Sequence, residues 1–181
     1  MMNKFDSTTF IKNNHERLIN YLRSLDEQTY LLAQHGKWSA AEQLDHLLKS
    51  VSPVNLALSL PKFVLKWMFG KANRPSRSYQ ELVEKYQVKL LAGGKAPKAF
   101  APKKIPFAQR DLSFTKLEKL ALSVSRKANR YSEEELDTLI LPHPLLGKLT
   151  LREMLYFTGY HCIHHHKLIE VAIANNEQNN L

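Results

Sequence analysis

The chain of 181 residues contains a single cysteine, Cys162. One thiol cannot form an intrachain disulfide, so the fold has no disulfide framework, and a reducing compartment is the simplest setting for it. The first ten residues, MMNKFDSTTF, lack the apolar core of a secretory signal. We therefore expect a cytoplasmic protein.

Long apolar runs are missing as well. The most hydrophobic stretch, residues 54–69, is interrupted by Pro61, Lys62 and Lys66 and is shorter than the roughly 20 apolar residues that a spanning helix needs. No strand-like alternation of useful length and no glycine-rich phosphate loop is visible. The sequence therefore predicts an all-α protein with no membrane segment.

The charge balance is basic, with 26 Lys and Arg against 17 Asp and Glu and a formal net charge of +9. Such a surface attracts anions, from acidic metabolites to nucleic acid. The positive charge is spread along the chain without the uninterrupted basic run of a nucleic-acid-binding arm, so we expect a small-molecule substrate rather than nucleic acid. The length suits a single domain over residues 1–181.

Helical periodicity predicts an antiparallel four-helix bundle. A long crossover rich in proline and glycine, residues 70–111, should connect the second and third helices, with a short helix at 79–91 inside it. The four long helices are expected at about 7–33, from Ser39 or Ala40 onward, at 113 to about 131, and at 150 to about 175.

Local signals set several of these boundaries. Ser39 with Glu42, and Thr150 with Glu153, have the spacing of capping boxes at the starts of the second and fourth helices. Pro53 should kink or end the second helix. Residues 132–139 predict a short helical turn, and the prolines and glycine of residues 142–147 predict a loop.

Histidines are concentrated in the last helix, with four between residues 161 and 166. Residues four apart on an α-helix differ by about 40° and lie on one face, whereas neighbours diverge by about 100°. His161 and His165 can therefore reach one metal ion together, while His166 points away. His164, about 60° from His161, could line the pocket beside them.

A third ligand has to come from another helix, and His46 on the second helix is the best candidate. It lies beside Leu47 and Leu48, at the edge of the inward face. Three neutral imidazoles would leave positions open for water or substrate, as in a catalytic metal site. His46, His161 and His165 are therefore the predicted ligands of one divalent ion.

The remaining candidates have simpler interpretations. His15, His35 and His143 are expected on the surface or in loops, although His143 could approach the pocket mouth. Cys162 is expected to be a small buried apolar residue, because no base is placed to activate it. Packing roles are expected for Trp38, Trp67 and Phe157, and helix capping explains Glu42 and Glu153.

Two other classes of helical metalloprotein are disfavoured. A zinc protease would carry glutamate directly after the first histidine of its H-E-x-x-H motif, where this chain has Cys162. A di-iron bundle would need several inward glutamates in Glu-x-x-His motifs, which the last helix does not provide.

Two segments resemble the motif regions of the DinB-like (DinB/YfiT-like) superfamily. They are residues 38–47, with Trp38-Ser39, Glu42 and Asp45-His46-Leu47, and residues 149–165, from Leu149-Thr150-Leu151 to Tyr160-His161 and His164-His165. The resemblance implies a four-helix bundle in an up-down-down-up arrangement, often dimeric. It also implies that His46, His161 and His165 bind zinc, nickel or a similar divalent ion.

Characterised members of the family include metal-dependent transferases that use bacillithiol, mycothiol or glutathione. The resemblance therefore implies a thiol S-transferase with a low-molecular-weight thiol as cosubstrate, and the basic surface suits an anionic thiol such as bacillithiol. Two alternatives stay open: a hydrolase that uses metal-bound hydroxide, and a non-catalytic, stress-related protein that binds a metal or ligand. Cys162, Ile163 and His164 follow His161 where relatives often have acidic or small residues, so the resemblance bears on the metal more than on the substrate.

Overall fold

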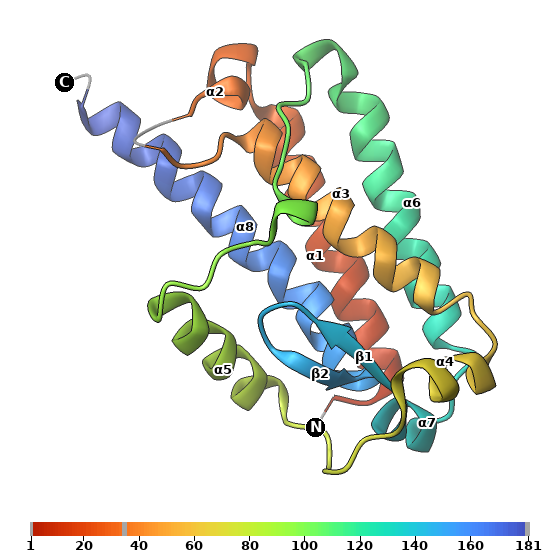
Figure 1. Cartoon of the computed structure of the whole chain (residues 1–181). Coiled ribbons are helices and arrows are strands. Elements are labelled where there is room, and N and C mark those ends of the chain that lie inside the picture. The colour runs from red at the N-terminus through yellow and green to blue at the C-terminus, as the bar shows by residue number, and fades with distance from the viewer. Residues whose placement is uncertain (1, 34–35, 180–181) are drawn as a thin grey trace.

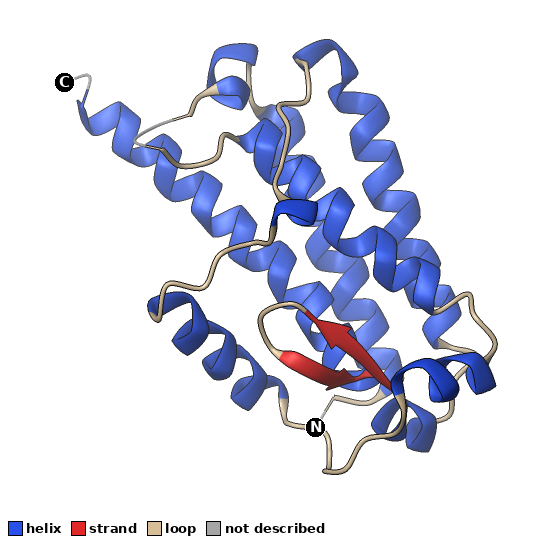
Figure 2. Cartoon of the chain, viewed as in Figure 1, coloured by secondary structure: helices blue, strands red, loops and turns tan. Residues whose placement is uncertain are grey.

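A computed structural model describes residues 2–33 and 36–179, and these are mostly helical, as expected (Figure 1). They also include a small two-stranded sheet (Figure 2). The long helices are α1 (Lys4–Ser24), α3 (Ala40–Ala57), α6 (Arg110–Ala128) and α8 (Leu151–Asn179). The short helices are α2 (Glu27–Leu31), α4 (Lys62–Phe69), α5 (Tyr79–Leu91) and α7 (Glu133–Thr138).

The four long helices pack through their apolar faces. Both α1 and α3 contact α6 and α8, so that α3 and α8 lie next to each other along part of their length (Figure 1). Gly159 in α8 allows close packing with α1, because a Cβ atom there would come within 2.4 Å of the Phe10 ring. Fully buried side chains of all four helices meet in the core, among them Leu18, Leu44, Phe114 and Leu155.

Both predicted capping boxes are present. The backbone N–H of Ser39 donates to Glu42 Oε2 at 2.8 Å, and the Ser39 hydroxyl accepts from the Glu42 N–H at 3.3 Å. Thr150 and Glu153 exchange the same pair of bonds, at 3.0 and 3.2 Å. The two helices that carry the candidate ligands therefore begin where the sequence predicts.

The prediction of one first helix over residues 7–33 is wrong. Leu25 has an extended backbone after α1, and the Asp26 side chain accepts a hydrogen bond from the Thr29 N–H to begin α2. An aspartate that caps a new helix competes with continuation of the old one, which apolar periodicity does not reveal. His35 lies outside the described residues.

Pro53 does not end its helix. It stands inside α3, which continues to Ala57, and the chain begins the separate helix α4 after Pro61. On α4 the indole of Trp67 is 85% exposed, so the expected packing role for this residue is wrong. The predicted short helix within the crossover is confirmed, because α5 spans Tyr79–Leu91.

A β-hairpin replaces the loop expected before the last helix. Strand β1 (Ile140–His143) pairs antiparallel with β2 (Gly147–Thr150), and Ile140 lies opposite Thr150. Gly147 has a φ of +78°, which glycine adopts without strain. Strands of four residues are too short to show a clear alternation of polar and apolar side chains, so the prediction of no strands failed here.

The start of α8 is fixed by a buried carboxylate. Glu153 is fully buried and accepts hydrogen bonds from the Arg74 guanidinium at 2.6 and 2.8 Å and from the Arg77 backbone N–H at 2.7 Å. Both arginines belong to the segment between α4 and α5, so this ion pair ties the crossover to α8. No described helix combines the length and the apolar character that crossing a membrane would require.

We predict that Glu153→Gln lowers the free energy of unfolding by about 3 kcal/mol near neutral pH, because the partly buried Arg74 guanidinium and Arg77 N–H lose their charged, fully buried acceptor. Burial raises the pKa of this carboxyl, but hydrogen bonds from Arg74, Arg77 and Thr150 outweigh it and hold the pKa below the ordinary value of 4.5. The carboxylate therefore stabilises the fold above that value, and the stabilisation is lost as the pH falls through the lower folded pKa.

Urea denaturation of wild type and variant between pH 3 and 7 measures this difference. The gap between the two proteins should narrow in the acid part of the range. The exposed Glu134→Gln serves as the matched control and should change stability by less than about 0.5 kcal/mol. A difference in unfolding free energy that stays constant at every pH would contradict a stabilising role for the Glu153 charge.

Candidate metal centre

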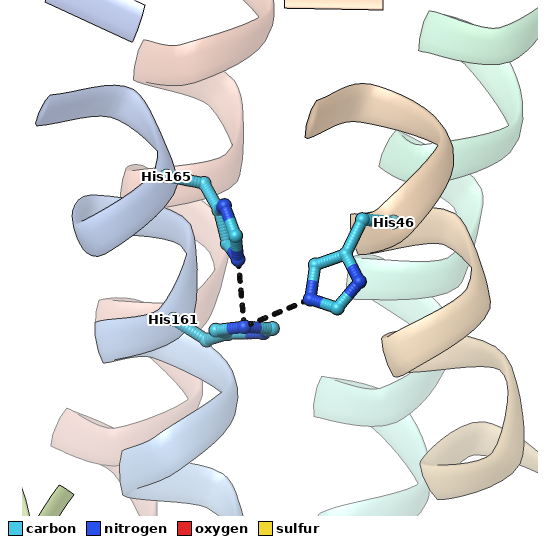
Figure 3. A group of neighbouring side chains, drawn as sticks. All are labelled: His46, His161 and His165. Atoms are coloured by element: carbon cyan, nitrogen blue, oxygen red, sulfur yellow. Dashed lines mark hydrogen bonds between the residues drawn. The ribbon is translucent and has the colours of Figure 1, made fainter. Parts of the chain in front are cut away.

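Three buried imidazole rings converge between α3 and α8 (Figure 3). His46 projects from α3, and His161 and His165 project from successive turns of α8. The Nε2 atom of His161 lies 3.2 Å from Nε2 of His46 and 2.8 Å from Nε2 of His165. Their ligand nitrogens all lie within 4.8 Å of one another, so the three residues could hold a metal ion.

The partners behind two of these rings fix which nitrogen carries the proton. Nδ1 of His46 lies 2.8 Å from the carbonyl oxygen of Phe100, and Nδ1 of His165 is hydrogen bonded to Oε1 of Gln43. A carbonyl or amide oxygen only accepts, so both Nδ1 atoms must donate their protons outward. His46 and His165 therefore direct bare Nε2 lone pairs toward His161.

This arrangement cannot satisfy itself by hydrogen bonding. Nε2 of His161 can offer one proton at most, yet it faces the lone pairs of both His46 and His165. The Ser50 hydroxyl lies 3.4 Å from Nε2 of His46, but it donates its one proton to the His46 backbone carbonyl at 2.8 Å, so at least one buried lone pair is left without a donor. A cation among the three nitrogens would satisfy all of them, and outward-donating Nδ1 atoms are the usual support of histidine ligands. The donor set fits a divalent metal ion.

Electrostatics keep the rings neutral. Burial lowers the pKa of His46, and it lowers the pKa values of His161 and His165 well below 6.5, where the neighbouring histidines add to the effect. Neutral imidazoles are the form that binds metal.

Aromatic rings enclose the cluster. The Trp38 indole lies nearly parallel to the His165 ring at 6.3 Å, and Phe157 stacks on His161 with 4.8 Å between centroids. The packing roles expected for Trp38 and Phe157 therefore agree with the structure, and each packs against the ring of a candidate metal ligand.

A cavity of about 490 Å³ reaches the cluster from one side, and His46 and His161 form part of its wall. His143, from strand β1, also lines this cavity, whereas His164 does not. The structure thus brings His143 to the pocket, as the sequence allowed, and leaves His164 outside it.

A comparison with protein-family models matches residues 11–169 to the model described as the DinB superfamily. The match covers most of the chain and includes all three candidate ligands. The chain belongs to the DinB superfamily. Comparisons with curated proteins and with solved structures gave no match.

The other histidines of this DinB superfamily chain do not join the cluster. His15 was expected on the surface, but it is buried in α1, where Nδ1 lies 2.8 Å from the Ile11 carbonyl oxygen and burial lowers its pKa to about 4. The His166 ring packs on Tyr21 at 4.6 Å, away from the site. Cys162 is buried as predicted, and burial raises the pKa of its thiol, so it stays protonated.

Sequence reasoning missed the two outward partners of the ligands. Gln43 precedes His46 by three residues on α3, so its position on the same helical face was a signal that could have found it. The carbonyl of Phe100 gives no signal, because every residue of the crossover has one. Which carbonyl meets His46 depends on the path of the chain through the short helical turn Lys98–Phe100.

We predict that Gln43→Leu weakens Zn²⁺ binding by about 10- to 100-fold, because His165 loses the acceptor that holds its tautomer and orientation. Gln43→Glu keeps an oxygen acceptor at that place and should bind at least as tightly as wild type. Competition with a chromogenic zinc chelator gives the affinities. Equal affinity in wild type and Gln43→Leu would contradict this role.

Proposed function

We propose that the chain is a divalent-metal-dependent thiol S-transferase, with zinc or nickel held by His46, His161 and His165. The observation that carries the proposal is the convergence of the Nε2 atoms of three histidines beside a cavity large enough for a small molecule. In His46 and His165 the hydrogen bond at Nδ1 leaves Nε2 with a lone pair and no proton. Membership of the DinB superfamily supports it.

The chain's own residues provide the binding site and its surroundings. Phe100 and Gln43 hold the His46 and His165 rings, while Trp38 packs beside His165 and Phe157 stacks on His161. A bound divalent ion would lower the pKa of a thiol at its open position. Substrate would approach through the cavity, because two of the candidate ligands, His46 and His161, form part of the cavity wall. His165 does not line the cavity.

A low-molecular-weight thiol of the bacillithiol type is the proposed cosubstrate. Lys95 lines the cavity and is exposed, so it would stand at the mouth, where its ammonium could pair with a carboxylate of such a thiol. The net charge of +9 favours the approach of an anion in the same way.

The chain is also proposed to form a single four-helix-bundle domain, to dimerise and to be cytoplasmic. The pairwise contacts of α1 and α3 with α6 and α8 support an antiparallel four-helix bundle as one domain over residues 1–181. Members of the superfamily are often dimeric, which supports a homodimer. The single buried cysteine suits a cytoplasmic protein.

A hydrolase is the second candidate from the same metal site. It would need a general base near the bound water. The described residues that line the cavity include no aspartate or glutamate, and the Nδ1 lone pair of His143 is already taken by two backbone N–H groups, so these residues offer no obvious base and thiol transfer is favoured. A non-catalytic metal-binding protein is the third candidate, and measurement of turnover separates it from the other two.

We predict that protein purified without an affinity tag contains close to one zinc or nickel ion per chain by elemental analysis. The double variant His46→Ala/His161→Ala should contain almost none, because a single imidazole holds a divalent ion weakly. His166→Ala, outside the cluster, is the matched control and should keep its metal. Equal metal content in wild type and double variant would contradict the proposed metal site.

Turnover is tested with bacillithiol and glutathione against 1-chloro-2,4-dinitrobenzene, where the sulfur bonds to the ring carbon, chloride leaves and the thiol proton passes to solvent. Loss of free thiol should require the metal and disappear in the double variant. Metal bound at full occupancy with no thiol consumed across a panel of thiols and electrophiles would overturn the transferase and favour the third candidate.

A further inference from the structure

The cavity beside the candidate metal centre has an apolar wall. Most of its lining comes from aliphatic, aromatic and proline side chains, and none of the described lining residues is acidic. Its volume of about 490 Å³ is within the usual range for small-molecule sites. The apolar side chains include Val51, Val54, Leu90, Leu141, Met154 and Phe157. Lys95, the one residue with a formal charge among the described lining residues, is exposed, so the interior of the cavity favours apolar molecules and opposes charged ones.

His143 brings one defined polar group to this wall. Its Nδ1 atom accepts the backbone N–H groups of Leu145 at 3.2 Å and Leu146 at 3.0 Å, both in the turn of the hairpin. An imidazole nitrogen that accepts two N–H groups cannot carry a proton. The proton of the neutral ring is therefore on Nε2, and the turn keeps this tautomer in place.

The Nε2–H group of His143 is free to meet a ligand. It has no hydrogen-bond partner among the described residues, and it is not one of their fully buried, unpaired polar atoms. Because the ring lines the cavity, this N–H can donate to a molecule inside it. Burial lowers the pKa of His143 to about 4, so the ring is an uncharged donor near neutral pH.

The donor stands close to the candidate metal centre. The His143 ring meets Phe157 edge-on at 4.2 Å, and Phe157 in turn stacks on His161 at 4.8 Å. A molecule held by His143 would therefore lie beside Phe157, the same ring that packs on the candidate metal ligand His161. Tyr86 also contacts Phe157, and burial raises its pKa to about 12, so its hydroxyl is a second neutral group on the same wall.

We infer that this cavity binds the electrophilic substrate, and that the substrate is a neutral, largely apolar α,β-unsaturated ketone, such as an aryl alkenyl ketone, whose carbonyl oxygen accepts a hydrogen bond from His143 Nε2–H. The thiolate sulfur would bond to the β-carbon, the alkene π electrons would move to the carbonyl oxygen to give an enolate, and the α-carbon would then take a proton from solvent. The inference rests on the proposed function for the role of that molecule as thiol acceptor. A hydrogen bond to the carbonyl withdraws electron density from the acceptor carbon, and it also fixes the orientation of the substrate. His143 is thus a binding and specificity residue.

The test uses 6-propionyl-2-(dimethylamino)naphthalene, a neutral aryl ketone whose fluorescence shifts to the blue in apolar surroundings and to the red when its carbonyl accepts a hydrogen bond. Wild-type protein should bind it with a saturable blue shift. Val54→Trp, which fills the cavity, should abolish this binding. Trp67→Ala removes an exposed indole outside the cavity and should leave it unchanged.

Two isosteric variants then locate the donor. His143→Phe should weaken binding about fivefold, the equivalent of one hydrogen bond of about 1 kcal/mol, and should move the emission of the bound probe further to the blue. Tyr86→Phe should change neither. His143→Gln, which retains an acceptor and a donor, should recover part of the affinity. Thermal unfolding of each variant shows whether the fold is intact.

The outcomes separate this inference from the proposed function. Saturable binding that depends on Val54 and His143 in a protein without metal or turnover would sustain the cavity assignment and overturn the transferase. Turnover with no cavity-dependent probe binding would overturn the cavity assignment alone. An emission change with Tyr86→Phe but not with His143→Phe would overturn the role of His143.

Discussion

The opposition of three imidazole nitrogens is the constraint on which the rest of the structure depends. The oxygens of Phe100 and Gln43 accept hydrogen bonds from the Nδ1–H groups of His46 and His165, and this forces two buried Nε2 lone pairs to face His161. Buried polar groups without partners cost free energy, and the neutral rings cannot remove the conflict among themselves. The fold therefore holds an arrangement that a cation would stabilise, which is the expected property of a preorganised metal site.

The long crossover has a structural role in that arrangement. It begins after α4, forms α5, and returns across α3 so that the Phe100 carbonyl meets His46. The same return places Lys95, Pro97 and Phe100 on the wall of the cavity. One segment thus orients a candidate ligand and encloses the space beside it. A short connection between α3 and α6 could do neither.

The sequence predicts those parts of the fold that depend on local chemistry. Capping boxes locate the starts of α3 and α8, and the spacing of His161 and His165 places both on one face. It does not predict the break at Leu25, because Asp26 competes locally with an apolar pattern that continues past it. It also gives no account of the Phe100 carbonyl or the His143 tautomer, since both depend on backbone groups brought together by tertiary structure.

The buried Glu153 connects the two sides of the site. It caps α8 two turns before His161, which is about 12 Å along the helix axis, and it lies three residues after Thr150, the last residue of strand β2 in the hairpin that carries His143. Its bonds to Arg74 and Arg77 fix the first turn of α8 against the crossover. Glu153 also accepts the Thr150 N–H at 3.0 Å, so the same carboxylate joins the end of the hairpin to the first turn of the helix that carries His161. The candidate metal centre and His143 are therefore attached to adjoining elements, as the proposed reaction between a thiol and a molecule in the cavity would require.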